Sequence, residues 1–194
     1  MHKQTPSQTL GPFFAYALSP AAYGRVGIAS EVLIDVQTRG QRITVHGVVR
    51  DGAGAPVSDA LVEIWQANAA GRYAHPEDMR ESEPLDVHFQ GFGRAETMPD
   101  GSYSFSSIKP GAVTADQAPH INVVVTARGM LSHVFTRVYF ADEANANAQD
   151  RVLASVPESR RHTLIATRTD AQAIPEYQFD ICLQGPNETV FFDA

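Results

Sequence analysis

The sequence predicts a mainly β protein: a single β-sandwich domain with an extended N-terminal arm and one or two short helices. Short segments rich in β-branched residues with partial period-two alternation recur along the chain, and turn signals containing Gly, Pro and Asp separate them. A hydrophobic content of 43% in 194 residues is enough to build one core. We expect residues 1–40 to form the arm and its lead-in, and residues 41–194 to form the sandwich.

The strand pattern can be followed from residue 42 to residue 184. It recurs in Arg42–Val49, Ala60–Trp65, Arg94–Met98, Ser102–Ile108, His120–Ala127, His133–Phe140, Thr163–Thr167 and Tyr177–Gln184. The turn signal Pro99-Asp100-Gly101 predicts a hairpin between the third and fourth of these segments. Residues 128–132 are expected to join the fifth and sixth as another pair.

Three other segments do not follow the strand pattern. Residues 143–154 are rich in Ala, with acidic residues early and Arg151 late, which predicts a helix. Residues 5–22 combine prolines with aromatic residues, so we expect an arm that packs on another surface. Residues 71–93 form a long irregular insertion of the kind that is usually functional or mobile.

Composition excludes several classes of function. The net charge of -7 and a pI near 5.4 argue against a nucleic-acid partner and against a basic membrane-binding face. No apolar run approaches the length of a membrane span, and the N-terminus lacks a secretory apolar region, so we expect a cytoplasmic protein. Charged residues make up 19%, a low share that favours partial coverage of the surface by another chain.

The segment His120-Ile121-Asn122 reads as half of a metal site. Residues two apart on a strand point to one face, so His-x-His would offer two imidazoles to one metal. Asn122 is a far poorer ligand for a transition metal than histidine. Tyr73, His75 and His88 upstream are residue types found in metalloenzymes. The alternative is a half-buried strand histidine whose ring is satisfied by the backbone.

Two blocks of sequence carry a specific resemblance. They are Glu-Ile-Trp-Gln-Ala-Asn-Ala-Ala-Gly-Arg-Tyr at 63–73 and Pro-His-Ile-Asn at 119–122, with further agreement at 5–12 and 185–193. In this order they resemble the intradiol ring-cleaving dioxygenases over nearly the whole chain. The resemblance implies a β-sandwich and a reaction in which O2 cleaves an aromatic ring between two hydroxylated carbons. It also implies a mononuclear Fe(III) held by two tyrosines and two histidines.

Only half of that ligand set is present here. Tyr73 matches the first tyrosine and His120 the first histidine, whereas Val113 and Asn122 stand where the second tyrosine and second histidine are expected. Gln117 replaces an arginine of the catalytic chains. The resemblance is closest to the chains that do not hold iron themselves. It therefore implies no metal in this chain, and Fe(III) in a homologous iron-binding beta chain with which this chain forms a higher hetero-oligomer.

Other matched positions imply contact with the partner's substrate. These are Arg128 and, on the arm, Thr9, Gly11, Pro12 and Phe13, where Phe13 lacks the hydroxyl of the family's common tyrosine. A fixed guanidinium at Arg128 suits the carboxylate of a small aromatic acid. The alternative readings are a solvated arginine at a strand end and a turn that only anchors the arm. No role is carried over for His75 or His88.

Three hypotheses follow from the sequence. In the first, the chain supports the active site of an iron-bearing partner that uses an aromatic acid and O2. In the second, the chain is a self-sufficient dioxygenase with an altered site made of Tyr73, His120 and one of His75 or His88. In the third, the chain is a β-sandwich interaction module without a catalytic role.

Overall fold

The structure is a computed structural model that describes residues 11, 14–169 and 172–193. In this part of the chain nine strands form one sheet in the order β3-β2-β5-β6-β7-β8-β1-β4, and β9 also pairs with β1. The strands are β1 (Arg42–Arg50), β2 (Ala60–Trp65), β3 (Phe92–Glu96), β4 (Ser102–Ile108), β5 (His120–Ala127), β6 (Val134–Phe140), β7 (Ile165–Thr169), β8 (Glu176–Gln178) and β9 (Ile181–Cys182). The mainly β prediction is confirmed.

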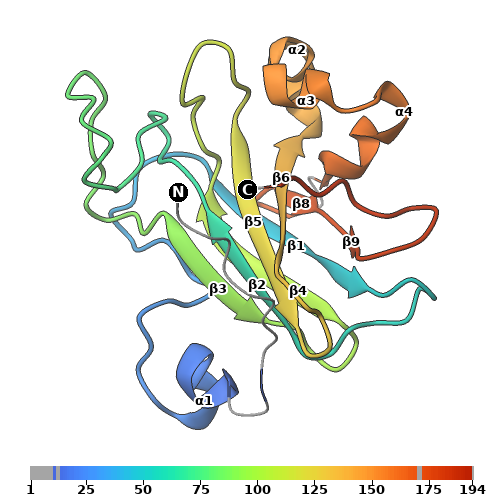
Figure 1. Cartoon of the computed structure of the whole chain (residues 1–194). Coiled ribbons are helices and arrows are strands. Elements are labelled where there is room, and N and C mark those ends of the chain that lie inside the picture. Colours follow the sequence, from blue (N-terminus) through green and yellow to red (C-terminus); the bar gives the residue numbers. More distant parts are fainter. Residues whose placement is uncertain (1–10, 12–13, 170–171, 194) are drawn as a thin grey trace, which may run out of the picture.

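The sheet folds into two layers that face each other across the core (Figure 1). One layer holds β3, β2, β5 and β6, the other holds β8, β1 and β4, and β7 pairs with both β6 and β8. Strand alternation explains the core: on β5, Ile121, Val123 and Val125 are buried in it, whereas Asn122 and Val124 lie half-buried on the opposite face. The outer face of β5 is where the candidate site lies.

The predicted hairpin at Pro99-Asp100-Gly101 is wrong. The tight turn exists, since the Gly101 N–H donates to the Met98 carbonyl oxygen at 2.7 Å, but β3 pairs with β2 and β4 pairs with β1. The turn therefore carries the chain from one layer to the other. The Val49 N–H on β1 donates to the Gly101 carbonyl oxygen at 2.9 Å, so a long-range contact fixes the turn.

The last predicted strand is also divided. The segment 177–184 becomes β8 and β9, because the chain bends around β1 at Phe179 and Asp180. A side chain at Gly47 would overlap the carbonyl oxygen of Phe179. The Val48 N–H on β1 donates to the side-chain Oδ1 of Asp180 at 3.0 Å, and Asp180 lies between the residues of β8 and β9 that pair with β1.

The predicted helix at 143–154 is broken at Asp150. It is divided into α2 (Ala144–Gln149) and α3 (Arg151–Ser155), between which Asp150 has an extended backbone and caps α3. The other short helices are α1 (Phe14–Leu18), η1 (Pro20–Tyr23), η2 (Ala141–Glu143), α4 (Glu158–Arg161) and η3 (His162–Leu164). The segments from η2 to η3 supply the crossover that the parallel pair β6–β7 requires.

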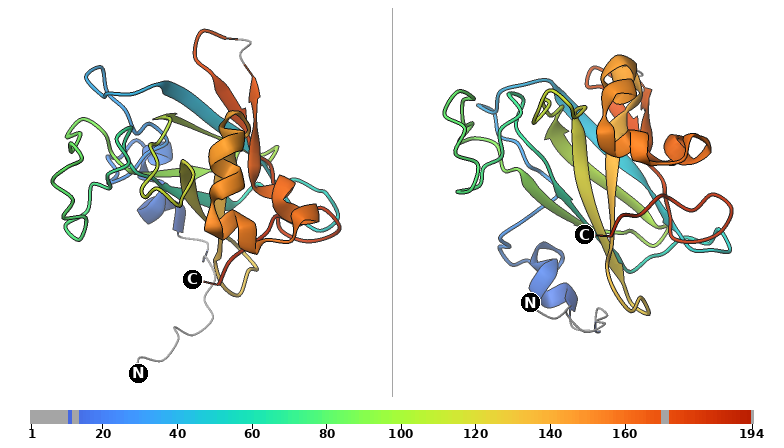
Figure 2. Two further views of the ribbon diagram at one scale, coloured as in Figure 1. Left: turned by 90° about the horizontal axis from the view of Figure 1, so that it is seen from above. Right: turned by 45° about the horizontal axis from the view of Figure 1, so that its top comes forward.

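The molecule has two distinct ends. The loops 66–91 and 109–119 meet at the end where β5 begins, and α2 to α4 lie beside it (Figure 1 and the right panel of Figure 2). The helix α1 and the turn between β5 and β6 lie at the other end. The described part of the arm is thus partly helical rather than wholly extended.

Candidate functional site

Two glycines bring the loops of the candidate site together. A side chain at Gly71, which has φ of +81°, would overlap the carbonyl oxygen of Ala112, and one at Gly111 would lie 2.6 Å from the Gly71 nitrogen. Both glycine N–H groups donate to the Asn68 carbonyl oxygen, at 3.0 and 2.9 Å. This close approach places Tyr73, which follows the first glycine, beside Val113, which follows the second.

The cross-strand register forms the floor of the site. Asn122 on β5 lies directly opposite Trp65 on β2 and Arg137 on β6. The Asn122 Nδ2 donates to the Tyr73 hydroxyl at 3.1 Å, and the Trp65 ring stacks on the Tyr73 ring with centroids 5.6 Å apart. At a position where a metal ligand is expected from the resemblance, an amide therefore binds the phenol itself.

A buried hydrogen-bond network fixes the position of His120. Its side chain is oriented by Nδ1, which donates to the Ala118 carbonyl oxygen at 2.8 Å, and the residue is only 3% exposed. The Asp150 carboxylate accepts from the Ala118 N–H at 2.8 Å and from the hydroxyl of Tyr139, the residue opposite His120, at 3.0 Å. Burial lowers the pKa of His120 against the opposing effect of its backbone hydrogen bond, so the imidazole is neutral near pH 7.

A cavity of about 640 Å³ opens beside Tyr73 and Val113. Its lining consists of Trp65, Tyr73, His75, Glu77, Asp78, Met79, Arg80, Val113 and Thr114. The Arg80 side chain spans the two loops, since its guanidinium donates to Gly71 O at 2.8 Å and to the carbonyl oxygen of Val113. The same guanidinium forms an ion pair with Asp78, so this charge is compensated within the loop.

These residues do not fit Fe(III). Burial raises the pKa of Tyr73, and this effect outweighs the hydrogen bond from Asn122 and the nearby charges of Arg137 and Arg80, which lower it. Of the four matched positions only Tyr73 and His120 keep a ligand-type side chain, because Val113 has no donor atom and the Asn122 amide is a poor ligand for a transition metal. Across the described ranges, no three His, Cys, Asp or Glu side chains gather as a metal site would need.

Arg128 lies at the far end of β5 from this cluster. It follows Ala127, so at about 3.3 Å per residue it is roughly 20 Å along the strand from Asn122. Its side chain is 61% exposed and forms an ion pair with Asp59, the residue before β2. Gly11 on the arm is exposed, and Thr9, Pro12 and Phe13 lie outside the described residues.

The two upstream histidines are separated in the structure. His75 is exposed, lines the same cavity as Tyr73, and its Nδ1 accepts from the Glu77 N–H at 3.2 Å. His88 is half-buried elsewhere, with Nδ1 3.0 Å from the Asp35 carboxylate. The structure therefore brings only His75 near the matched ligand positions.

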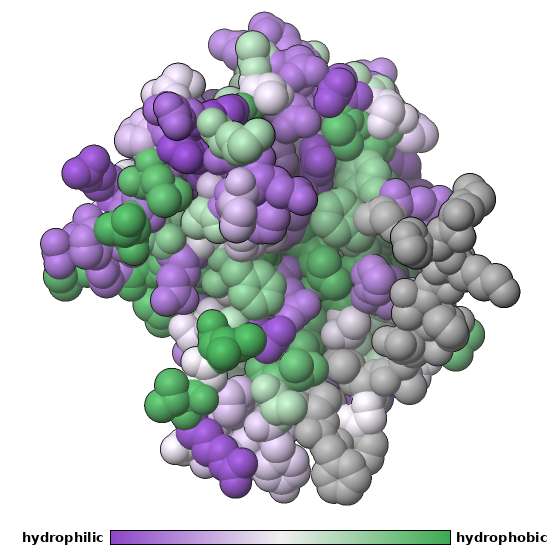
Figure 3. Space-filling view, turned by 60° about the vertical axis from the view of Figure 1, so that its left-hand side comes forward, coloured by the Kyte–Doolittle hydropathy of each residue, from purple (hydrophilic) through white to green (hydrophobic). Residues whose placement is uncertain are grey.

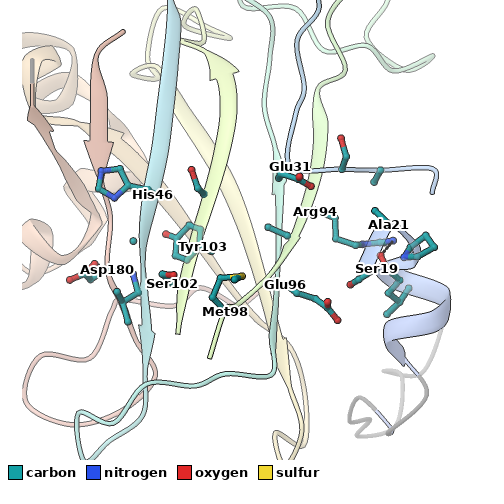
Figure 4. A pocket seen from close by; sticks show the side chains of 18 of the residues that line it. Ser19, Ala21, Glu31, His46, Arg94, Glu96, Met98, Ser102, Tyr103 and Asp180 are labelled. Atoms are coloured by element: carbon teal, nitrogen blue, oxygen red, sulfur yellow. Dashed lines mark hydrogen bonds between the residues drawn. The ribbon is translucent and has the colours of Figure 1, made fainter. Parts of the chain in front are cut away.

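A second cavity, of about 720 Å³, lies between the N-terminal segment and the sheet (Figure 4). Arg94 on β3 points toward that segment, where its Nη1 donates to the Leu18 carbonyl oxygen at 3.3 Å while it pairs with Glu63. Exposed apolar side chains lie on the side of the molecule shown in Figure 3 and elsewhere on the surface. They include Tyr16, Tyr23, Val26, Ile28, Met79, Val87 and Met98.

Arg137 and Arg80 were not among the candidate residues identified in the sequence. For Arg137 a signal exists: Arg137 and Tyr139 alternate on one face of a predicted strand, next to the strand that carries His120. The pairing register that sets Arg137 opposite Asn122 depends on the tertiary structure, so a local sequence pattern does not reveal it. Arg80 lies in an irregular loop without any periodic signal.

Comparison with known proteins identifies the family of this chain. A family model described as Dioxygenase matches residues 11–185. The protocatechuate 3,4-dioxygenase alpha chain of Burkholderia cepacia is 47% identical over 198 residues, covering 99% of this chain and 98% of its own. This chain belongs to the intradiol ring-cleavage dioxygenase family. The family is one of oxidoreductases that depend on non-haem iron.

Two further family members are informative. The beta chain of protocatechuate 3,4-dioxygenase from B. cepacia is 39% identical over 161 residues, which cover 77% of this chain and 67% of the beta chain. An intradiol ring-cleavage dioxygenase from Tetranychus urticae shares the fold, with a TM-score of 0.63 at 18% identity and coverage of 97% and 99%. No helix in the part of the chain that the structure describes has the length and apolarity to cross a bilayer.

Proposed function

We propose that this chain is the alpha subunit of a protocatechuate 3,4-dioxygenase. In the assembled enzyme, O2 cleaves the ring of protocatechuate between its two hydroxylated carbons. Both oxygen atoms enter the product, 3-carboxy-cis,cis-muconate, which is an intermediate of the β-ketoadipate pathway. The observation that carries the proposal is the 47% identity, over nearly the full length of both chains, to a protein named as such an alpha chain.

The metal belongs to the partner in this proposal. A homologous beta chain would hold Fe(III), because this chain offers one phenol and one imidazole at the matched positions and has Val113 and the Asn122 amide at the other two. The similarity to a named beta chain supports a pair of related chains. We expect the pair to assemble into a higher hetero-oligomer in the cytoplasm.

Arg128 and the arm would be this chain's contribution to the beta chain's active site. The arm residues are Thr9, Gly11, Pro12 and Phe13. Arg128 lies about 20 Å along β5 from the ligand remnant, so it serves no site built around Tyr73 and Asn122. Its exposed guanidinium is free of the core and can bind the carboxylate of protocatechuate when a partner covers it.

The experiment is to express this chain and a homologous beta chain separately and together, and to follow O2 uptake with protocatechuate. The proposal requires turnover by the co-purified complex and none by this chain alone. Turnover by this chain alone would instead support a self-sufficient enzyme that uses Tyr73, His120 and His75. A complex that forms but gains nothing over the beta chain would support the interaction-module hypothesis.

A further inference from the structure

We propose that Arg137 excludes a metal ion from this chain, so that restoring the two missing ligands would not by itself restore a metal site. This inference rests on the proposed function, in which iron is absent from the alpha chain. It goes further by assigning the exclusion to a residue outside the four matched ligand positions.

The register places the charge in the site. Arg137 on β6 lies directly opposite Asn122 on β5, and opposite residues in an antiparallel pair have Cβ atoms about 4.5–5.5 Å apart. Tyr139, two residues along, lies opposite His120 in the same way. Arg137 thus shares one face with the two β5 positions that match ligands.

The charge of Arg137 lacks a neutralising partner. Its Nε and Nη1 atoms are buried without hydrogen-bond partners, and no carboxylate pairs with it in the described part of the chain. The residue is half-buried and its guanidinium also has a hydrogen bond with Tyr139, which is uncharged. A cation without a paired carboxylate repels a trivalent ion three times as strongly as it would a monovalent one at the same distance. Asn122 Oδ1, an acceptor on the opposite strand, is also buried and unpartnered.

Arg80 is the natural comparison because it is a second guanidinium near Tyr73. Unlike Arg137, it forms an ion pair with Asp78, whose pKa is held far below its ordinary value chiefly by the hydrogen bond from Arg80. The pair is close to neutral as seen from the cavity. Removing Arg80 would therefore expose an acid and loosen two loops, whereas removing Arg137 would subtract one positive charge from the ligand cluster.

The test starts from a variant that restores both ligands, Val113→Tyr with Asn122→His. To it we would add Arg137→Gln, which keeps amide donors and removes the charge. The matched control is Arg80→Gln together with Asp78→Asn, which removes an ion pair without changing the net charge. Each full chain is incubated with Fe(II) in air and desalted. Iron per chain and the visible tyrosinate band are then measured, with circular dichroism to check the fold.

The double variant should retain little iron, and adding Arg137→Gln should raise iron per chain by at least about tenfold, as expected if charge repulsion sets the affinity. Equal loading of the double and triple variants would overturn the proposal. So would a folded triple variant without iron, or an equal gain from the control that removes Arg80 and Asp78 together. Iron in the unaltered chain would instead refute the proposed function.

A smaller change covers the case in which the rebuilt chains do not fold. Asn122→His alone would place two imidazoles, His120 and the new histidine, on one face of β5 as ligands suited to Zn(II). Titration with Zn(II) should show at least about tenfold tighter binding when Arg137→Gln is added, again from charge repulsion. Unchanged Zn(II) affinity would overturn the assignment to Arg137.

Discussion

Asn122 changes what the residues around it can do. At the position of a histidine ligand it places an amide whose donor is used by the hydroxyl of Tyr73. The phenol then acts as a structural group in a stack with Trp65. The Tyr73 side chain is therefore held by a hydrogen bond and an aromatic contact.

Arg128 makes the most direct functional prediction. In the complex, Arg128→Ala should raise the KM for protocatechuate by about ten- to a hundredfold, because a hydrogen bond to a charged group contributes about 1.5–3 kcal/mol. Catechol, which lacks the carboxylate, should be affected much less, and Arg128→Lys should keep part of the effect. Steady-state kinetics with both substrates is the measurement, and equal losses on both would refute the role.

The environment of Asp142 predicts that the free energy of unfolding depends on pH in the acidic range. Burial raises the pKa of its carboxyl, but hydrogen bonds from Lys109, Tyr177 and Arg168 outweigh burial and hold the pKa below its ordinary value of 3.8. A lowered folded-state pKa stabilises the fold above the unfolded pKa, and this stability is lost as pH falls through the folded-state pKa.

Replacement of Asp142 by Asn should therefore cost about 1 kcal/mol near neutral pH, a modest value because the side chain is partly exposed. The cost should begin to shrink as pH falls below about 4, and it should vanish below the folded-state pKa, where the Asp142 carboxyl is protonated in the folded protein too. Urea unfolding across this pH range measures it. A cost that does not change with pH would mean that the carboxylate charge is irrelevant.

At the scale of elements, the sequence predicted strand positions better than strand partners. The bounds of β2, β4 and β5 were predicted to the residue, because alternation and turn residues are local signals. The hairpin at Pro99-Asp100-Gly101 was wrong because pairing depends on which layer each strand joins. The break at Asp150 arises from contacts with Ala118 and Tyr139, which no local pattern reveals.

The candidate site shows the same contrast between what the sequence predicts and what depends on strand pairing. The resemblance identified Tyr73, Val113, His120 and Asn122, and the structure brings these positions together at one end of the sheet. Arg137 required the strand register, because its relevance depends on lying opposite Asn122.

The loop junction should be sensitive to one methyl group. Gly71→Ala places a Cβ onto the Ala112 carbonyl oxygen in addition to the cost of a positive φ, so we expect a loss of about 2–4 kcal/mol. Gly54→Ala is the matched control, since its φ is +80° and nothing lies within 4 Å of the added carbon. That control should cost only about 1–2 kcal/mol. Equal losses by chemical denaturation would show that the close approach is not tight.

Asp150 should be the most important carboxylate for the helical crossover. It is fully buried, caps α3 by accepting from the Leu153 N–H at 2.7 Å, and also accepts from Ala118 and Tyr139. Asp150→Ala should cost about 3 kcal/mol or more, because three buried donors lose their acceptor.

The control for this change is an exposed carboxylate in the same region. Asp116 pairs with Arg151 at the surface, and Asp116→Ala should stay within about 1 kcal/mol. Comparable losses in the two variants, measured by urea unfolding, would contradict the role of Asp150 as the buried anchor of His120 and α3.

At the scale of the whole molecule, the two ends carry different tasks. The end with the loops 66–91 and 109–119 holds the positions that match metal ligands of the family. There Asn122 donates to the Tyr73 hydroxyl, Arg80 donates to the Gly71 carbonyl oxygen, and Arg137 lies opposite Asn122. The other end presents Arg128 and α1, and Val26 and Ile28, which lie between α1 and the sheet in the sequence, are almost wholly exposed. This distribution suits a subunit that completes the site of a homologous partner.

The most direct test of the central claim is the iron content and visible absorbance of this chain, expressed alone and then with a homologous beta chain. Tyrosinate bound to ferric iron absorbs visible light, so the two preparations can be compared by colour and by metal analysis. We predict a colourless, iron-free chain alone and a coloured complex with a single iron for each pair of chains. A coloured, iron-loaded chain in the absence of a partner would contradict the account.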